Sequence, residues 1–164
     1  MKEIIEHAFP RARIDRADII PEFPLRKGTM SEGAPDDDRS TNVDYLVLDR
    51  TASTAYLVEL KTDESSVGSS QRTLLVEATR KIPALLDGIL RITAKPKLGH
   101  RWKYEALRRK LHDLKWVEER AGEWVRCGAP KTVKAVYIKP TGEWSQRSGG
   151  PDTSDITVIS FKGV

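Results

Sequence analysis

Three charged residues, Asp44, Glu59 and Lys61, interrupt two otherwise apolar stretches of the chain. The stretches, residues 43–49 and 55–61, are rich in β-branched, aromatic and aliphatic residues, and the short polar segment between them predicts an antiparallel hairpin. Glu59 and Lys61 are two apart, so they point to the same face of their strand. Because ionised groups seldom persist in buried strands without a partner or a metal, these three residues form a candidate site.

A hairpin turn at residues 51–54 predicts that Asp44 lies opposite Lys61. The same register sets Leu46 opposite Glu59, so Asp44 and Glu59 become diagonal neighbours, roughly 7–8 Å apart at the backbone. Two carboxylates at this spacing can share one divalent cation, which lowers the pKa of an attacking water. A lysine beside them can position that water or stabilise a phosphate. These are the groups that phosphodiester hydrolysis requires; the alternative is a weak ion pair on a solvated strand face.

The residues before this hairpin predict little regular structure. Residues 1–9 have the spacing of a short amphipathic helix, which Pro10 ends. Residues 10–42 contain several prolines and glycines and predict a long irregular connection, with no separate strand before Asp44.

The residues after the hairpin predict helices and then strands. Helical spacing begins at Gln71, with Pro83 as a kink or break, and residues 101–120 predict a second helix. Residues 132–139 and 156–162 predict two further strands. The expected fold is therefore α/β, one domain spanning residues 1–164, with a central mixed sheet flanked by helices. The hairpin at 43–61 is apolar on both faces and is expected at the centre of that sheet.

Charge and composition favour a soluble protein that acts on a polyanion. The net charge is +4, residues 95–139 are basic and residues 31–63 are acid-rich. A basic region can bind phosphates, and an acidic region beside it can bind a cation. Cys127 is the single cysteine, so an intrachain disulfide and a Cys-rich zinc site are excluded. The low cysteine content favours a cytoplasmic location. The Cys127 side chain is expected to be buried or half-buried. No apolar run suits a membrane or a signal peptide, and no glycine-rich loop predicts a nucleotide cofactor.

A basic, aromatic helical region is expected at residues 95–126. Trp102 and Tyr104 lie among its cations, so the region could hold phosphates and stack on a base or sugar. A solvated helix with its aromatic rings in the core is the alternative. The candidate DNA-binding residues are Lys95, Lys97, Arg101, Lys103, Arg108 and Arg109.

Asp44 followed by Glu59-Leu60-Lys61 on the next strand resembles the PD-(D/E)XK nuclease superfamily, and residues 58–63 are similar to its RecB-like members. The resemblance covers residues 1 to about 140, and its specific part is residues 43–71. It implies a restriction-endonuclease-like fold, dependence on Mg²⁺ or Mn²⁺, and DNA as the substrate; a homodimer is compatible with it. The site residues that it implies are Asp44, Glu59 and Leu60 for the metal, Lys61 and Gln71 for catalysis, and Glu3 or Glu6 as an accessory acid.

Two other functions remain open at the level of the sequence. One is a nucleic-acid-binding or scaffold domain that keeps the nuclease fold without cutting. The other is a protein-interaction domain in which the three charged residues form a structural salt-bridge cluster.

Overall fold

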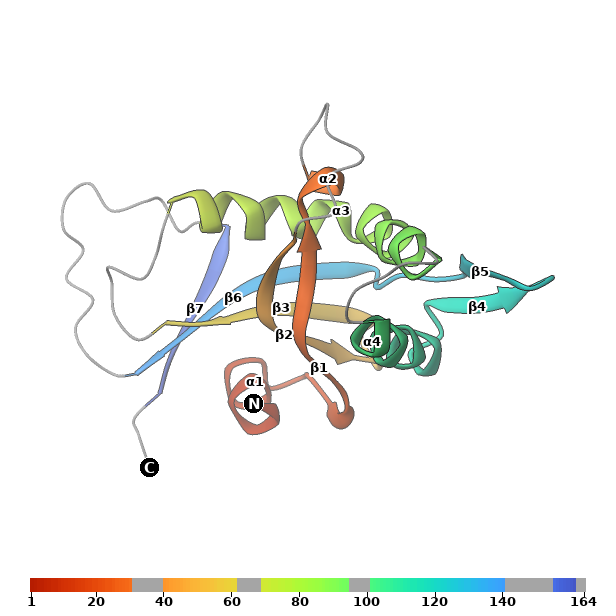
Figure 1. Ribbon diagram of the computed structural model, residues 1–164. Helices are drawn as coiled ribbons and strands as arrows, with labels where there is room; N and C mark the ends of the chain where they lie inside the picture. Colours follow the sequence, from red (N-terminus) through yellow and green to blue (C-terminus); the bar gives the residue numbers. More distant parts are fainter. Residues whose placement is uncertain (31–39, 62–68, 95–100, 141–154, 162–164) are drawn as a thin grey trace.

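The computed structural model describes residues 1–30, 40–61, 69–94, 101–140 and 155–161. In these residues the chain is α/β, with a five-stranded mixed sheet and helices on both of its faces (Figure 1). The helices are α1 (Lys2–Ala8), α2 (Lys27–Met30), α3 (Ser69–Thr93) and α4 (Arg101–Asp113). The strands are β1 (Ile14–Arg26), β2 (Ser40–Asp49), β3 (Thr54–Leu60), β4 (Val117–Arg120), β5 (Glu123–Arg126), β6 (Thr132–Pro140) and β7 (Ile156–Phe161).

The central sheet has the strand order β1-β2-β3-β6-β7. The first three strands pair antiparallel, whereas β3–β6 and β6–β7 are parallel. The mixed sheet and the central place of the hairpin are therefore confirmed. A central strand of such a sheet is buried on both faces, which explains why residues 43–49 and 55–61 show no alternation of apolar and polar residues.

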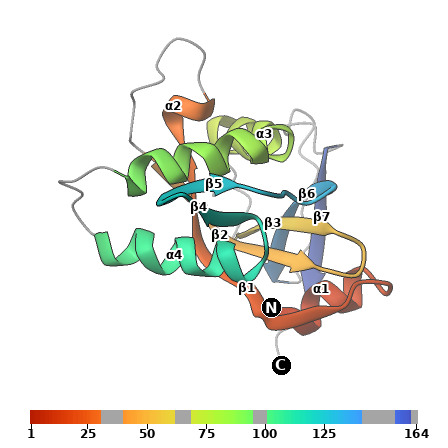
Figure 2. The same ribbon diagram turned by 90° about the vertical axis from the view of Figure 1, so that its right-hand side faces the viewer.

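Two apolar clusters lie on opposite faces of the sheet (Figure 2). On one face α3 and α4 cover residues of all five strands; the cluster includes Leu46, Leu57, Leu75, Ile82, Leu111 and Tyr137. On the other face α1 covers a smaller cluster, which includes Ile5, Val47, Val58, Val136 and Ile138. Successive residues of β3 point alternately into the two clusters, as a strand requires.

The expectation of an irregular segment at residues 10–42 is wrong for much of that range, because residues 14–26 form β1. The misleading signals were Pro21 and Pro24, which pair with Tyr45 and Asn42 of β2. β1 is an edge strand and has a neighbouring strand on one side only. A proline that lacks an N–H on the outer side of β1 therefore removes no hydrogen bond of the sheet. Glu22 has a φ of 49°, another irregularity in this strand. Residues 31–39 lie outside the described part of the chain.

The hairpin register differs by two residues from the predicted one. The last pair before the turn is Asp49 with Thr54, and Tyr45 lies opposite Val58. The Asp49 carboxylate accepts hydrogen bonds from the backbone N–H groups that follow it, at 3.0 and 3.3 Å. This cap stabilises a turn at residues 50–53 instead of 51–54. A shift of two leaves the side chains of β3 on their expected faces.

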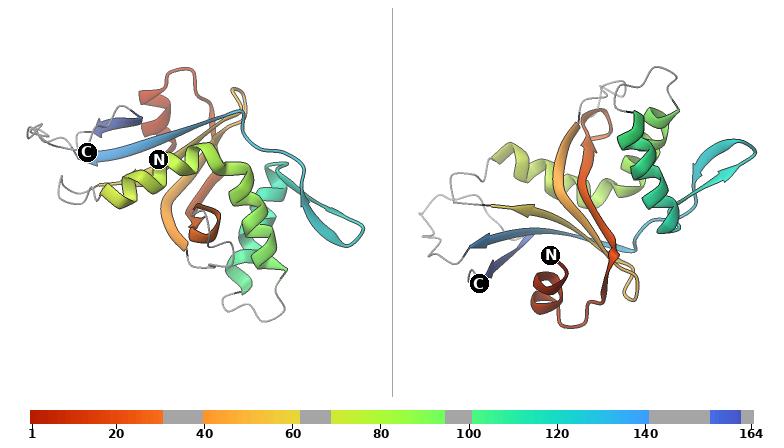
Figure 3. Two further views of the ribbon diagram at one scale, coloured as in Figure 1. Left: turned by 90° about the horizontal axis from the view of Figure 1, so that it is seen from above. Right: turned by 60° about the horizontal axis from the view of Figure 1, so that its bottom comes forward.

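The helical reading of residues 101–120, and of the wider region 95–126, is wrong after Asp113. The chain turns at Lys115, whose φ is 62°, and forms the β4–β5 hairpin, which projects away from the central sheet (Figure 3). Buried Trp116 anchors its base, since its carbonyl accepts hydrogen bonds from the N–H groups of Cys127 and Gly128. Cys127 is exposed, so the expected burial of its side chain is also wrong.

The remaining elements agree with the sequence. α1 ends before Pro10, and β6 and β7 occupy the two predicted C-terminal strands. α3 has a kink where Lys81 leaves helical geometry, two residues before Pro83, whose ring disfavours a straight helix. Within the described ranges, no helix has the length and apolar character that crossing a membrane would demand.

Candidate functional site

The candidate site lies where β3 ends, on the face of the sheet that α3 covers. Glu59 and Lys61 come from the end of β3, and Asp44 comes from the antiparallel neighbour β2. Gln71 lies in the first turn of α3, which begins at the same edge. The structure therefore brings together four of the residues singled out from the sequence, from three different elements.

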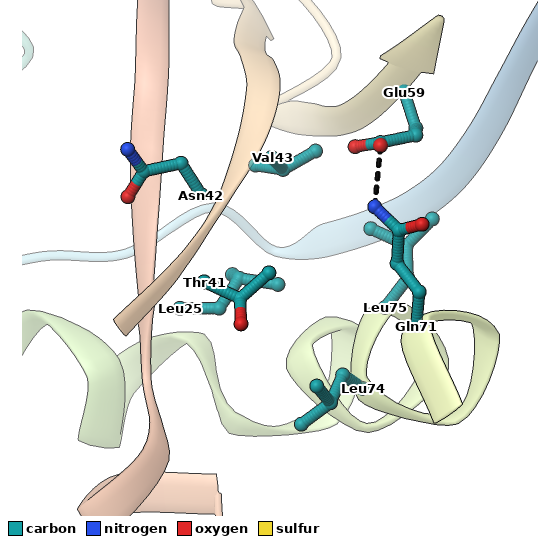
Figure 4. Close-up of a pocket in the computed structure, with 8 residues that line it drawn as sticks. All are labelled: Leu25, Thr41, Asn42, Val43, Glu59, Gln71, Leu74 and Leu75. Carbon is teal, nitrogen blue, oxygen red and sulfur yellow. Dashed lines mark hydrogen bonds between the residues drawn. The ribbon is translucent and has the colours of Figure 1, made fainter. Parts of the chain in front are cut away.

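Glu59, Lys61 and Gln71 form a closed group of hydrogen bonds. The Lys61 Nζ donates to Glu59 Oε1 at 3.2 Å and to Gln71 Oε1 at 2.8 Å. Gln71 Nε2 donates to the same Glu59 oxygen at 2.5 Å (Figure 4). Gln71 thus fixes the positions of both charged side chains.

Asp44 lies one position beyond the Tyr45–Val58 pair, which places it directly opposite Glu59 instead of diagonal to it. Its Oδ2 accepts a hydrogen bond of 2.7 Å from the backbone N–H of Leu60. The N–H and C=O groups of one strand residue point toward the same neighbouring strand. The Leu60 carbonyl therefore also points toward β2, which carries Asp44. The two carboxylates and this carbonyl form a set of hard oxygen donors.

Burial gives Glu59 an unusual protonation equilibrium. Its side chain and that of Lys61 belong to residues only 8% and 4% exposed. Burial and then the negative charge of Asp44 raise the pKa of Glu59, and the charge and hydrogen bond of Lys61 oppose them without cancelling them. A divalent cation between the carboxylates would counteract both causes of the raised pKa.

A small pocket borders Glu59 and Gln71 (Figure 4). Its volume is about 10 Å³, enough for about one water molecule. The lining comes from β1, β2, β3 and α3, and its residues are Leu25, Thr41, Asn42, Val43, Glu59, Gln71, Leu74 and Leu75. A water there would find the Glu59 and Gln71 side chains as its polar partners, with Thr41 and Asn42 at the rim.

Two carboxylates with a backbone carbonyl are compatible with Mg²⁺, which usually keeps several waters and takes one or two carboxylates from the protein. In the part of the chain that is described, no group of three or more His, Cys, Asp or Glu side chains gathers to hold a metal ion. The two carboxylates and the carbonyl therefore suit a cation such as Mg²⁺ that takes its remaining ligands from water, and not a cation bound by protein ligands alone.

The predicted accessory acids are not part of this group. Both belong to α1, which covers the opposite face of the sheet (Figure 1). The Glu6 Oε1 accepts a hydrogen bond from the N–H of Ile14 at 2.8 Å, which joins α1 to β1. Glu3 is exposed and pairs with the N-terminal amine.

The predicted DNA-binding residues that the structure describes all belong to α4, and their surroundings differ. Lys103 pairs with Glu22 at 2.6 Å, and the Arg108 guanidinium lies 4.5 Å from the centroid of the Trp124 ring. Arg109 is exposed. Trp102 is 71% exposed, so the alternative of an aromatic ring turned into the core does not hold for it. Lys95, Lys97 and the side chain of Arg101 lie outside the described residues.

Sequence reasoning missed two residues of β6 that face the site. Tyr137 pairs with Glu59, and its ring centroid lies 5.3 Å from the Lys61 Nζ. Lys139, two positions on and therefore on the same face, is only 7% exposed. A lysine within an apolar strand is the signal that had drawn attention to Lys61, and it was present here too.

Comparison with protein-family models, with curated proteins and with solved structures found no match to this chain.

Proposed function

We propose that this protein is a metal-dependent nuclease that hydrolyses DNA phosphodiester bonds through Asp44, Glu59, Lys61 and Gln71. The observation that carries the proposal is the hydrogen-bonded group of Glu59, Lys61 and Gln71 at the end of the central strand, with Asp44 beside it. Solvated ion pairs are mobile and exposed, whereas Glu59 and Lys61 are buried and the four residues come from three elements.

The fold proposal is a restriction-endonuclease-like domain of the PD-(D/E)XK type. Its support is the order of the elements: a helix, an antiparallel hairpin that carries the Asp and Glu-x-Lys residues, a helix, and a strand parallel to the second hairpin strand. β1 also provides the strand before Asp44 that the sequence alone did not predict.

Mg²⁺ or Mn²⁺ would be held by Asp44, Glu59 and the carbonyl of Leu60. The cation would neutralise charge on the phosphate and lower the pKa of an attacking water. Hydrolysis forms one P–O bond to the water oxygen and breaks one P–O ester bond; the water loses a proton, and the leaving oxygen gains one. Lys61 would stabilise the extra negative charge on the phosphate, and Gln71 would hold Lys61 and Glu59 in position.

DNA as the substrate has support from charge. α4 and the segment before it are basic, and α4 exposes Trp102 and Arg109. Exposed aromatic and guanidinium groups suit stacking and phosphate contacts.

The test is cleavage of linear, circular and single-stranded DNA with Mg²⁺ or Mn²⁺. We expect Glu59→Ala and Lys61→Met each to lower the rate by about 100-fold or more, as loss of a charge-stabilising group does. Glu119→Ala, at an exposed position of β4, is the matched control and should cut like the wild type. Absence of cutting by the wild type, or equal cutting by all variants, would refute the catalytic assignment.

The salt-bridge alternative has one observation in its favour: Glu59, Lys61 and Gln71 satisfy one another without a metal. Thermal unfolding with and without Mg²⁺ separates the two. A ligand that binds the folded state raises the midpoint, so a nuclease site predicts a rise that Glu59→Ala abolishes, and a purely structural cluster predicts none.

A further inference from the structure

Cationic side chains continue from the candidate site across the neighbouring strand β6. The paired residues of β3 and β6 end with Leu60 opposite Ile138, and the N–H of Lys61 donates to the Ile138 carbonyl at 2.9 Å. Lys61 and Lys139 therefore occupy adjacent positions at the ends of two parallel strands, about 4.8 Å apart at the backbone. Both lysines are buried, at 4% and 7% exposure, and both lie on the face that α3 covers.

Arg72 belongs to α3, which packs against β6. It follows Gln71, and it is half-buried. Its positive charge lowers the pKa of Tyr137, although burial and the charge of Glu59 raise that pKa overall. Gln71 contacts Glu59 of β3, and the neighbouring Arg72 is close enough to β6 for its charge to act on Tyr137. The Arg72 Nε is buried and has no hydrogen-bond partner within the described residues.

Tyr137 lies between these cations. Its ring is fully buried, and its hydroxyl group also has no hydrogen-bond partner in the described part of the chain. The Lys61 Nζ lies 5.3 Å from the ring centroid. A buried hydroxyl and a buried guanidinium nitrogen without acceptors both cost free energy, and an anion with several oxygens would satisfy both.

We propose that Arg72, Tyr137 and Lys139 form a second phosphate site on the β6 side of the Asp44–Glu59 pair. Its ligand is a phosphodiester of the same nucleic-acid strand, next to the one that is cut, so the inference rests on the proposed function. Arg72 provides a planar fork for two phosphate oxygens, Tyr137 a hydroxyl donor and Lys139 a compact charge. The substrate is then a polynucleotide with consecutive phosphates, not an isolated phosphate ester.

The experiment is equilibrium binding of a fluorescent DNA oligonucleotide to the full chain, in Ca²⁺ to prevent cutting, over a series of salt concentrations. Removing one phosphate contact lowers the salt dependence of affinity by about one unit of slope. We expect Arg72→Met and Lys139→Met each to show this change and to bind about tenfold more weakly, with Lys139→Arg restoring most of the affinity.

The control is Lys134→Met. Lys134 belongs to the same strand but to the other face, where its Nζ lies 4.9 Å from the Phe9 ring centroid, so its removal should leave DNA binding unchanged. Circular dichroism verifies that each variant is folded; Arg72 is half-buried and provides the test if Lys139→Met does not fold.

If folded Arg72→Met binds DNA with the affinity and the salt dependence of the wild type, the inference is overturned. If the wild type also cuts DNA in Mg²⁺, the proposed function survives that result. If the variants bind weakly as expected but the wild type never cuts, the second phosphate site stands and the nuclease proposal fails. A wild type that binds no DNA overturns both.

Discussion

At the scale of single residues, Glu59 combines two opposing features. Its Oε1 accepts hydrogen bonds from Lys61 and Gln71, which favour the ionised form. Its pKa is nevertheless raised, because burial and the nearby Asp44 carboxylate outweigh these contacts. In the absence of a cation the site therefore disfavours the negative charge on Glu59 that the proposed metal site requires.

A pH dependence of stability follows from this raised pKa. The folded state binds the Glu59 proton more tightly than the unfolded chain does, so this residue's stabilising contribution is complete below the ordinary value of 4.5 and is lost as the pH rises through the folded-state pKa. Glu59→Gln cannot titrate there. We expect the free energy of unfolding of wild type, minus that of Glu59→Gln, to fall as the pH rises from about 4 to 8.

The measurement is urea unfolding of both proteins in EDTA at several pH values. Groups that titrate alike in the two proteins cancel in the difference. Addition of Mg²⁺ near neutral pH should stabilise the wild type and not the variant. A difference that stays constant with pH would contradict the raised pKa.

At the scale of elements, the contact between α2 and α3 depends on a missing side chain. Gly88 of α3 faces Thr29 of α2, and a Cβ at that position would lie 2.6 Å from the Thr29 Oγ1. The short, branched threonine side chain cannot move far, so alanine would be overpacked here even though it is the better helix former.

We expect Gly88→Ala to lower the free energy of unfolding by about 1 kcal/mol, because overpacking outweighs the gain in helix propensity. In a Thr29→Ala background, the same substitution should stabilise by up to about 1 kcal/mol, since the clash is absent. Urea unfolding of the four proteins gives the coupling energy. Additive effects of the two substitutions would show that the two helices are not in close contact at this point.

At the scale of the whole molecule, β3 lies between two separate apolar clusters, and only the larger one borders the candidate site. The smaller cluster, around Ile5, seals the opposite face. Stability and site chemistry should therefore be separable by substitutions on the two faces.

Ile5→Ala should lower the free energy of unfolding by about 2–5 kcal/mol, because Ile5 is fully buried and truncation leaves a cavity. Stabilisation of the folded protein by Mg²⁺ should remain as in the wild type, since the substitution lies across the sheet. Urea unfolding with and without Mg²⁺ measures both quantities. Loss of the Mg²⁺ effect in a still-folded Ile5→Ala would indicate that the two faces are coupled.

Much of the fold follows from local patterns in the sequence. The helix at Gln71, its break near Pro83 and four of the strands of the central sheet are confirmed because each depends on residues close together in the chain. Glu59 and Lys61 share one face because strand side chains alternate with a period of two, and Asp44 contacts the same strand through the N–H of Leu60.

Other features depend on pairing between distant segments. The prolines in β1 predict a loop from local pattern alone. They are compatible with a strand because β1 lies at the edge of the sheet, where a missing N–H need not remove a hydrogen bond between strands. The turn at residues 50–53 depends on the Asp49 cap, and the β4–β5 hairpin continues a segment with helical periodicity.

Local sequence pattern predicts which residues of the hairpin are candidate site residues, because strand periodicity and the rarity of buried charge are local properties. Only the tertiary structure placed Gln71 on Glu59 and set Tyr137 and Lys139 beside them. The parallel pairing of β3 with β6 joins residues about eighty positions apart, and no local period encodes such a contact, since it is selected by the burial of the whole sheet between two layers.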